Sequence, residues 1–299
     1  MISNKVLLSL FLILLGTSAS GATTINVGPG QTYSTIQSAI DAANADDMIS
    51  VSEGTYYENL VVKKDGIFII GKNKEKTIID GQQTGSVIRL EANNVTVSGF
   101  TLLNNGGSGK EDAGITIYSA DNNMVANSII MNNNIGVAIY STSNNNVITG
   151  NYIKSNYRNG IFVFNSIENK IYNNNIQNNK IGFYGDSARI NSIYSNNFID
   201  NNDQAYDDSG MNSWDDGKTG NYWSNYKGTG AYDILGPAKT RDDHPVTNPL
   251  IVKDVAITTT TEKPIDQKTQ EETGKSSSGF TGIVVLISLI MAIVLRYKK

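Results

Sequence analysis

Asparagines recur at a nearly constant spacing through the middle of this chain, and this repeat limits the folds that the chain can adopt. One column comprises Asn127, Asn151, Asn174 and Asn196, which lie 24, 23 and 22 residues apart. A second column has the same spacing and comprises Asn132, Asn156, Asn179 and Asn201. A period of about 20–50 residues is typical of solenoids, in which each repeat buries its core against its neighbours. The L-x-x-L-x-L frame of leucine-rich repeats is absent from this region. The spacing therefore predicts a parallel β-helix with asparagine ladders along its coils.

Alternating apolar stretches predict the strands of each coil. The segments after Gly114, Gly136 and Gly160 read Ile-Thr-Ile-Tyr, Val-Ala-Ile-Tyr and Ile-Phe-Val-Phe, and alternation with period two is typical of a strand. The inward side chains predicted on these strands are Ile115, Ile117, Val137, Ile139, Ile161 and Val163. A second inward column is predicted at Met124, Ile148, Ile171 and Ile193. Apolar residues also follow the first asparagine column by two positions, at Ile129, Ile153, Ile176 and Phe198.

A short amphipathic helix is predicted before the first coil. Ser34-Thr35-Ile36-Gln37 reads as a capping box, and one face of the following helix would carry Ile36, Ala39, Ile40 and Ala43. Such a helix would cover the open edge of the first coil, which could otherwise pair with other chains.

The two ends of the chain read as export and anchoring signals. Residues 1–22 contain Lys5, an apolar run and then small residues, which predicts a signal peptide. Residues 279–299 contain an uncharged apolar stretch followed by a basic tail, which predicts a transmembrane anchor. Residues 253–278 are rich in Thr, Ser, Glu and Lys and predict a solvated stalk. The body then divides into an N-terminal cap with the first coils (23–85), the repeats (86–226) and a C-terminal cap (227–252).

Composition excludes several classes of function. The net charge is −4 and no basic stripe is present, so nucleic acid is not a predicted partner. The chain has no cysteine and one histidine, His244, which excludes thiolate chemistry and a zinc ribbon. Asn94-Val95-Thr96 is a glycosylation sequon, so Asn94 is a predicted modification site.

Two parts of the sequence resemble known families. Residues 31–40 and 49–59 resemble the opening of right-handed β-helix proteins of the pectinesterase and pectate-lyase type. Residues 204–208, 212–215 and 220–226, the last reading Gly-Asn-Tyr-Trp-Ser-Asn-Tyr, resemble the end of NosD-like β-helix domains. The resemblance covers about Thr24 to Leu250. It implies a right-handed parallel β-helix of the kind abundant in archaeal surface proteins. The tail from Ser278 to Lys299 is similar to archaeal sorting signals with a Pro-Gly-Phe motif, although Ser278 replaces the proline.

The sequence departs from the resemblance where metals are concerned. NosD-like domains take their name from an accessory protein of nitrous oxide reductase maturation, but copper requires thiolate, thioether or imidazole ligands. With no cysteine and one histidine, copper delivery is disfavoured. The acidic loop that resembles a calcium site in such domains is replaced by residues 230–237. No cofactor and no metal site are therefore predicted, and calcium is left as an alternative that these residues do not support.

An enzymatic interpretation depends on carboxylates near the end of the repeats. Hydrolases on this fold use paired carboxylates, and lyases use calcium with a basic residue. The candidate acids are Asp207, Asp208, Asp215 and Asp216, with Asp186, Asp200 and Asp203 nearby and with Arg158 and Arg189 as candidate bases. Asp186 and Asp208 could stack on adjacent coils, but no earlier coil supplies a third member. In the competing interpretation these carboxylates cap turns.

Rows of aromatic side chains provide the alternative site. Three residues share one outward register, Tyr118, Tyr140 and Phe164. A neighbouring register carries Phe162 and Tyr184, and a row on the next strand carries Tyr172 and Tyr194. Exposed aromatic rings could stack on the apolar faces of sugars, or they could only stabilise adjacent strands.

The sequence thus predicts an exported, membrane-anchored cell-surface β-helix protein. We expect it to bind or scaffold polysaccharide or envelope components without catalysis. A polysaccharide lyase or hydrolase acting through the Asp-rich terminal coil is the first alternative. A purely structural envelope protein is the second.

Overall fold

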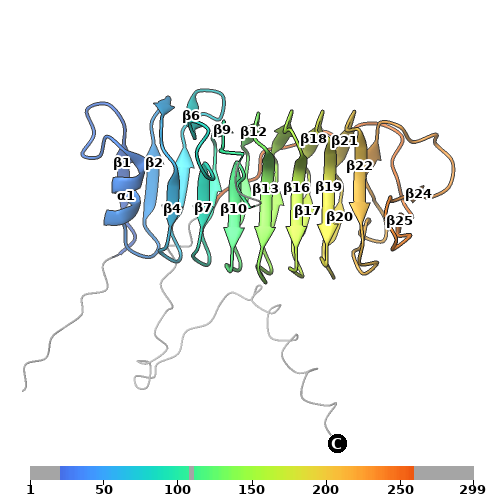
Figure 1. The fold of residues 1–299 in the computed structure, drawn as a ribbon. Coiled ribbons are helices and arrows are strands. Elements are labelled where there is room, and N and C mark those ends of the chain that lie inside the picture. Colours follow the sequence, from blue (N-terminus) through green and yellow to red (C-terminus); the bar gives the residue numbers. More distant parts are fainter. Residues whose placement is uncertain (1–20, 108–110, 259–299) are drawn as a thin grey trace, which may run out of the picture. The chain divides into compact units, whose positions relative to one another are not determined.

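The computed structural model describes residues 21–107 and 111–258, which form a parallel β-helix of the right-handed type (Figure 1). Each full coil contributes one strand to each of three parallel sheets, here called A, B and C. Strands of successive coils pair in register, so equivalent side chains lie above one another along the solenoid. The all-β prediction and the parallel β-helix are confirmed.

Short strands make up the three sheets, and sharp corners separate them. Sheet A consists of β1 (Thr24–Val27), β2 (Met48–Val51), β5 (Phe68–Gly71), β8 (Thr96–Ser98), β11 (Met124–Ala126), β14 (Val147–Thr149), β17 (Lys170–Tyr172) and β20 (Ser192–Tyr194). Sheet B consists of β3 (Gly54–Tyr56), β6 (Thr77–Asp80), β9 (Thr101–Leu103), β12 (Ile129–Met131), β15 (Tyr152–Lys154), β18 (Asn175–Gln177), β21 (Asn197–Ile199) and β23 (Tyr222–Trp223). Sheet C consists of β4 (Leu60–Val62), β7 (Ile88–Leu90), β10 (Ile115–Tyr118), β13 (Ile135–Tyr140), β16 (Asn159–Phe164), β19 (Ile181–Asp186) and β22 (Asp203–Asp207). A two-stranded antiparallel hairpin of β24 (Tyr232–Asp233) and β25 (Arg241–Asp242) follows.

The bore of the solenoid is filled by the predicted apolar columns. The six inward side chains predicted on sheet C are all fully buried. In sheet A the column Val125, Ile148, Ile171 and Ile193 is fully buried, and in sheet B so is the column Ile130, Ile153, Ile176 and Phe198. Removing these side chains from water is the main driving force for the fold.

Four predicted positions in one coil are wrong by one residue. Met124 and Ile129 are only partly buried, and their neighbours Val125 and Ile130 point inward instead. The ladder positions are likewise taken by Ser128 and Asn133 rather than by Asn127 and Asn132. The true step from this coil to the next is 23 residues. Matching asparagine with asparagine gave a step of 24, because the residue at the correct position of the first ladder is a serine.

Three buried ladders follow the three corners, and each is defined by one repeated contact. The side-chain Oδ1 of a ladder asparagine accepts a hydrogen bond from the backbone N–H of the ladder residue one coil earlier. The A–B ladder comprises Ser128, Asn151, Asn174, Asn196 and Asn221. The B–C ladder comprises Asn133, Asn156, Asn179 and Asn201. The C–A ladder comprises Asn123, Asn146, Asn169, Asn191 and Asn212 and is not among the predicted columns. The ladders satisfy corner peptide groups that are cut off from water, as buried polar groups require.

A column of glycines makes room for the B–C ladder, and Gly160 provides a test. A Cβ atom on Gly160 would lie 2.7 Å from the carbonyl oxygen of Gly182 and 2.9 Å from Nδ2 of Asn179. Both groups are part of the stacked coils, so Gly160→Ala should lower the free energy of unfolding by about 1–3 kcal/mol. Urea denaturation measures this change. Gly107→Ala is the control, since a Cβ there meets nothing within 4 Å. A Gly160→Ala protein as stable as this control would contradict the packing.

The N-terminal end of the solenoid is closed by α1 (Ile36–Ala42). The four predicted face residues are buried, which confirms the amphipathic helix. The helix begins one residue later than the capping box suggests, because Thr35 is the N-cap and accepts a hydrogen bond from the N–H of Ser38. The carboxylate of Glu58 accepts hydrogen bonds from the N–H groups of Ile36 and Gln37.

Several predictions on the chain ends lie outside the described residues. They are the signal peptide apart from its last two residues, the anchor at 279–299, the sorting signal and the stalk beyond residue 258. Within residues 21–107 and 111–258, no helix is long and apolar enough to cross a membrane.

Candidate functional site

The terminal carboxylates hold the end of the solenoid together. Asp207 is fully buried. Its Oδ1 accepts hydrogen bonds from the N–H of Ser209 at 3.1 Å and from Nδ2 of Asn212 at 3.0 Å, and its Oδ2 accepts one from the hydroxyl of Thr240 at 3.2 Å. Because Asn212 is the last residue of the C–A ladder, Asp207 ends that ladder with a group that only accepts hydrogen bonds.

The other three predicted acids cap turns. Asp208 accepts a hydrogen bond from the N–H of Ser187 at 2.8 Å. Asp215 accepts one from the N–H of Gly217 at 2.7 Å and lies 3.1 Å from Nδ1 of His244. Asp216 is exposed and accepts hydrogen bonds from two N–H groups of its own turn, chiefly that of Thr219, which lower its pKa. The arrangement matches the turn-capping interpretation for these acids.

The outer face of sheet C carries a continuous run of aromatic rings, here called the aromatic track. It consists of Tyr118, Tyr140, Phe162, Phe164, Tyr184 and Tyr206. Phe162 and Tyr184 stack with ring centroids 5.2 Å apart, and Tyr184 meets Tyr206 at 5.1 Å. Tyr140 contacts Phe162 at 5.2 Å and Phe164 at 5.7 Å. The registers Tyr118 with Tyr140 and Phe162 with Tyr184 are confirmed by strand pairing.

Exposure varies along the aromatic track, and two of the rings that were expected to be exposed, Tyr140 and Phe162, are buried. Tyr140 and Phe162 are only 6% and 7% exposed. They pack with Ala113, Ile135 and Ala138 into a small apolar cluster outside the bore. Tyr184 and Tyr206 are partly exposed and Phe164 is 37% exposed. The accessible part of the track therefore lies toward its C-terminal end.

The predicted pair Tyr172 and Tyr194 forms a separate stack. Their rings lie 5.4 Å apart and nearly parallel, on the outer face of sheet A. They do not extend the aromatic track, which lies on sheet C.

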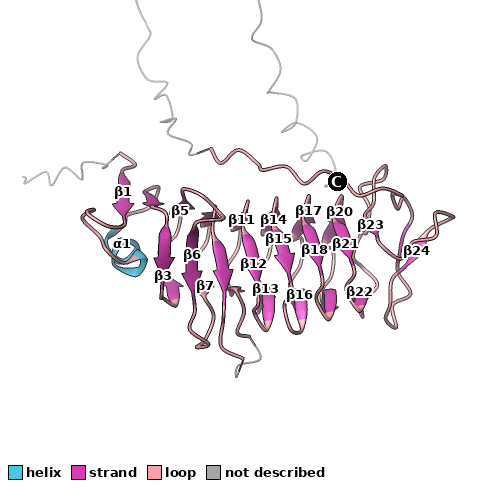
Figure 2. Ribbon diagram, turned by 90° about the horizontal axis from the view of Figure 1, so that it is seen from above, coloured by secondary structure: helices cyan, strands magenta, loops and turns pink. Residues whose placement is uncertain are grey.

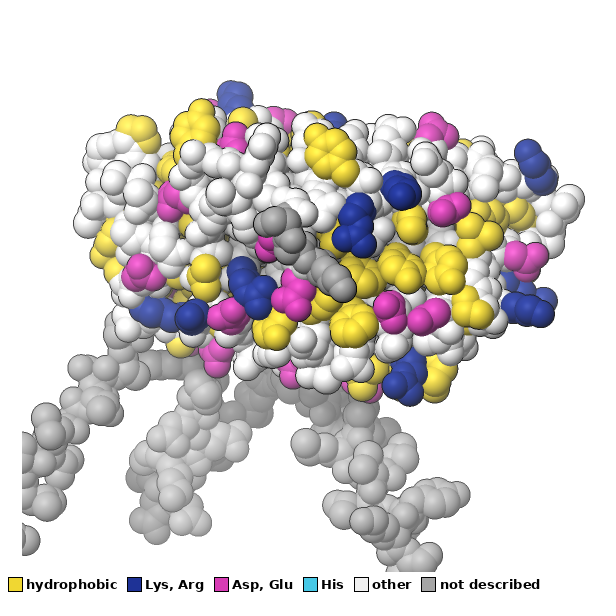
Figure 3. Space-filling model, in the orientation of Figure 1, with side chains coloured by type: hydrophobic (Ala, Val, Ile, Leu, Met, Phe, Trp, Pro, Cys, Tyr) yellow, Lys and Arg dark blue, Asp and Glu magenta, His cyan; other side chains and the backbone are white. Residues whose placement is uncertain are grey.

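Charged side chains border the aromatic track on both edges. Arg158 and Lys180 occupy equivalent exposed positions before β16 and β19, since the N–H of Ile181 bonds to the carbonyl of Arg158. Asp186 pairs with Phe164 at the far end of the strands, and Asp208 follows one coil later. Figure 3 shows this face, with a row of hydrophobic side chains, mainly basic side chains above the row and mainly acidic ones below it.

The tyrosines of the aromatic track respond to burial and to these charges. Burial, then Glu111 and Asp186, raise the pKa of Tyr140 to about 12, against a lowering by Arg158. Burial and then Asp186 also raise the pKa of Tyr184, again opposed by Arg158. Both phenols are therefore neutral hydrogen-bonding groups at physiological pH. Asp186 on one edge and Arg158 on the other therefore affect the pKa of the same two phenols, in opposite directions.

At the N-terminal end of the aromatic track, Arg89 covers Tyr118. The guanidinium carbon lies 4.2 Å from the ring centroid, a cation–π contact. Nε of Arg89 lies 2.6 Å from Glu91, and Nη1 lies 3.7 Å from Glu111. The Tyr118 ring is therefore already in contact with another side chain of the protein.

The sequence interpretation missed three residues of this site, Tyr206, Arg158 as a border residue and Lys180. The signal was present in each case. Tyr206 follows Tyr184 by 22 residues, as Lys180 follows Arg158. On sheet C the predicted rows lie in stretches that follow a glycine, and in β22 the position equivalent to Gly182 is Gln204.

The fold and this face define a class, namely a parallel β-helix protein with a charge-bordered aromatic surface on one sheet. Residues 18–228, more than half of the chain, match the family described as periplasmic copper-binding protein (NosD), and the chain belongs to this family. The resemblance to NosD-like domains is thereby confirmed. A cell surface glycoprotein of Methanothermus fervidus is 32% identical over 129 residues. The match covers 42% of this chain but only 21% of that relative.

Several solved structures are similar to this chain at low sequence identity. A pectin methylesterase from Aspergillus niger has a TM-score of 0.45 at 14% identity, covering 81% of this chain and 95% of its own. Pectin methylesterase PemA from Erwinia chrysanthemi has a TM-score of 0.43 at 11% identity, covering 77% and 94%. A PL6 family alginate lyase has a TM-score of 0.49 at 17% identity, covering 67% and 32%. Likeness at this level says nothing about what this chain does.

The residues present do not fit a copper site, despite the family's description. Copper favours thiolate, thioether and imidazole ligands, and the chain has no cysteine. Nδ1 of the single histidine, His244, already contacts Asp215. In the described part of the chain, no group of three or more His, Cys, Asp or Glu side chains could hold a metal ion.

Proposed function

We propose that this protein is exported to the cell surface and binds a polysaccharide along the aromatic track of sheet C without cleaving it. The observation that carries the proposal is the row of Phe162, Tyr184 and Tyr206 on successive coils, of which Tyr184 and Tyr206 are partly exposed. The ring centroids lie 5.2 Å apart in the stacked pair Phe162–Tyr184 and 5.1 Å apart in the edge-to-face pair Tyr184–Tyr206. A pyranose residue in an extended glycan has a similar length, so one sugar could face each coil. The relative named as a cell surface glycoprotein supports the location.

The borders of the track favour a glycan with acidic groups. Arg158 and Lys180 could bind carboxylate or sulfate groups on one edge of the sugar chain, as charge-assisted hydrogen bonds. Asp186 and Asp208 could accept hydrogen bonds from hydroxyls on the other edge. The rings between them would stack on the apolar faces of the sugars.

The carboxylates of the terminal coil accept hydrogen bonds from the protein itself, and this supports binding rather than catalysis. Asp207 is buried and accepts hydrogen bonds from four donors, and Asp215 and Asp216 are held by their own turns. A general acid or base must reach the substrate proton directly or through one water. These side chains are committed to structural hydrogen bonds.

Tyr184→Ala combined with Tyr206→Ala should weaken retention of acidic polysaccharides about 5- to 160-fold, because each lost ring removes about 0.5–1.5 kcal/mol of stacking. Affinity electrophoresis in gels containing uronate-rich glycans measures the retention. Tyr157→Ala is the control, since Tyr157 is 73% exposed but does not belong to the track. The double variant should unfold at nearly the temperature of the wild type.

Two outcomes would reject the proposal. Equal retention of the double variant and the wild type would leave the rings with a purely structural role in strand pairing. Release of new reducing ends or unsaturated products from any retained glycan would make the protein an enzyme.

A further inference from the structure

After the terminal hairpin, the chain turns back and runs along the outside of the solenoid. Residues 250–255, here called the strap, pass along the corner between sheets A and B (Figure 2). The strap bonds to Asn197 at its start and to Asn127 at its end. Lys253, where the predicted stalk begins, is thus bound to the solenoid.

Three asparagine side chains hold the strap, and each makes the same pair of hydrogen bonds. Its Oδ1 accepts from a strap N–H, and its Nδ2 donates to the carbonyl of the same residue. Asn197 binds Leu250 in this way at 2.8 and 2.8 Å, and Asn173 binds Lys253 at 3.1 and 2.7 Å. Asn127 binds Val255 at 2.8 and 2.9 Å. The amides thus pair with the strap as a neighbouring β-strand would.

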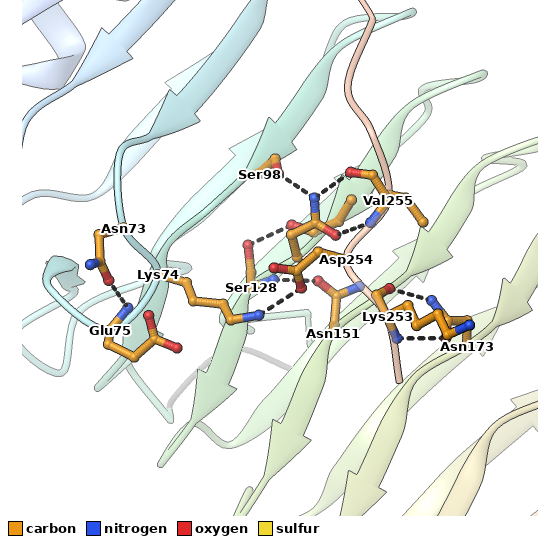
Figure 4. A network of polar contacts seen from close by, with 12 residues as sticks. Asn73, Lys74, Glu75, Ser98, Ser128, Asn151, Asn173, Lys253, Asp254 and Val255 are labelled. Atoms are coloured by element: carbon orange, nitrogen blue, oxygen red, sulfur yellow. Dashed lines mark hydrogen bonds and ion pairs between the residues drawn. The ribbon is translucent and has the colours of Figure 1, made fainter. Parts of the chain in front are cut away.

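The coils themselves shape this corner for a peptide (Figure 4). Asn127 and Asn173 occupy the left-handed corner position, with φ of 51° and 56°, and each is fixed by a backbone hydrogen bond to the next coil. Between them the same position is Gly150, where a Cβ would lie 3.3 Å from the carbonyl oxygen of Lys253. A side chain at this coil would crowd the strap.

The contacts involve the strap's main chain far more than its side chains. Ile251 is 80% exposed, and Lys253 is also exposed. The exception is Asp254, whose carboxylate lies 2.7 Å from Nζ of Lys74, a largely buried ammonium group. The site therefore requires an extended peptide with free N–H groups and one acidic residue, and accepts varied side chains elsewhere.

We propose that the A–B corner is a preformed binding site for extended polypeptide, and that the strap is its resident, displaceable ligand.

Binding of the strap also fixes the place at which the chain leaves the solenoid. Ile257 lies in the same hollow as Gly71, Lys74 and Gly99, near β5 and β8 and far from the C-terminal cap. A force applied to the chain beyond residue 258 would act on the side of the solenoid.

The test uses the full chain with its strap released. Lys253→Pro combined with Val255→Pro removes two of the three N–H donors and leaves every solenoid residue intact. This variant should bind a fluorescent peptide of residues 250–257, added in trans, at least tenfold more tightly than the wild type does. In the wild type the tethered strap competes at an effective concentration of about millimolar. Fluorescence anisotropy measures the binding.

Modified peptides test the main-chain recognition. A peptide that keeps Asp254 but carries alanine at Ile251 and Lys253 should bind as well as the parent peptide. A peptide N-methylated at Lys253 and Val255 should fail, and so should the parent peptide on a released-strap variant that also carries Asn127→Ala and Asn173→Ala. The proposal is overturned if the released-strap variant does not bind the parent peptide, or if N-methylation leaves the affinity unchanged. None of these outcomes depends on glycan binding.

Discussion

Asn174→Leu is expected to lower the free energy of unfolding of this protein by about 3–5 kcal/mol. Asn174 is fully buried in the middle of the A–B ladder. Its Oδ1 accepts from the N–H of Asn151 at 3.0 Å, and its Nδ2 donates to the carbonyl of Ile148 at 2.8 Å and to Oδ1 of Asn196 at 3.0 Å. Leucine branches at Cγ as asparagine does, but it is larger and can make none of these bonds.

The expected loss of stability is large because several buried polar groups lose their hydrogen-bond partner, the Asn174 amide, at the same time. The N–H of Asn151 and the carbonyl of Ile148 would remain buried without a hydrogen bond, and each such group costs about 1–3 kcal/mol. Water cannot replace the missing amide at a corner that is closed by the neighbouring coils. The apolar surface added by leucine recovers part of this cost.

Urea denaturation of the purified protein, followed by circular dichroism, measures the change. Asn202→Leu is the matched control, because Asn202 is an exposed asparagine on a nearby coil. Surface substitutions of this kind usually change stability by less than about 0.5 kcal/mol. If the two variants unfold at the same urea concentration, the ladder does not stabilise the fold.

The ladders also show how far the fold could be predicted from sequence. The period and the inward columns follow from spacing, because equivalent residues of a solenoid lie above one another. Asn151, Asn174 and Asn196 were assigned correctly for this reason. Asn127 was not, because side-chain type was used to choose the register and the true member, Ser128, is a serine. Its neighbour Asn127 is free to hold the strap instead.

For the aromatic track, the sequence predicted which rings lie in the same register, but it did not predict which rings are exposed to solvent. Strand alternation places Tyr140 and Phe162 outside the bore, and they do lie there. Their burial arises from contacts among side chains of adjacent coils, such as Ile135 and Ala138, which alternation alone does not reveal. The strap was not predictable either. Its first residues were assigned to the C-terminal cap and residues 253–255 to the solvated stalk, and its contacts are mostly made by main-chain atoms, which every sequence has.

Asp242→Leu is expected to destabilise the C-terminal cap by about 3–5 kcal/mol. Asp242 is fully buried and ends the A–B ladder. Its Oδ2 accepts from the N–H of Asn221 at 2.7 Å and from Nε1 of Trp223 at 2.9 Å, and its Oδ1 accepts from the N–H of His244 at 3.0 Å. Leucine would leave the N–H of Asn221 and Nε1 of Trp223 buried without an acceptor, and it would also remove the partner of the partly buried N–H of His244.

Thermal unfolding measures this loss. The control is Asp243→Leu, which removes a carboxylate on the surface beside Asp242, paired there with Arg241. Exposed pairs of this kind contribute about 0–1 kcal/mol. An Asp242→Leu protein no less stable than the control would show that the ladder needs no terminal acceptor.

The pH dependence separates the hydrogen bonds of Asp242 from the cost of burying its charge. Burial raises the pKa of Asp242 above its ordinary value, although its hydrogen bonds lower it. The folded state therefore holds this proton more tightly than the unfolded state does. The contribution to stability is complete below the unfolded pKa, about 3.9, and is lost as the pH rises through the folded pKa.

Asp242→Asn keeps the shape of the side chain and cannot ionise. The stability of the wild type minus that of Asp242→Asn should therefore fall as the pH rises from about 3.9 through the folded pKa, and then become constant. Taking this difference cancels the carboxylates with lowered pKa values, Asp47, Glu91 and Asp216, which act in the opposite direction. A difference that rises with pH would mean that the hydrogen bonds from Asn221, Trp223 and His244 outweigh desolvation. Asp242 would then be a stabilising anion, and the ladder would favour charge at its end.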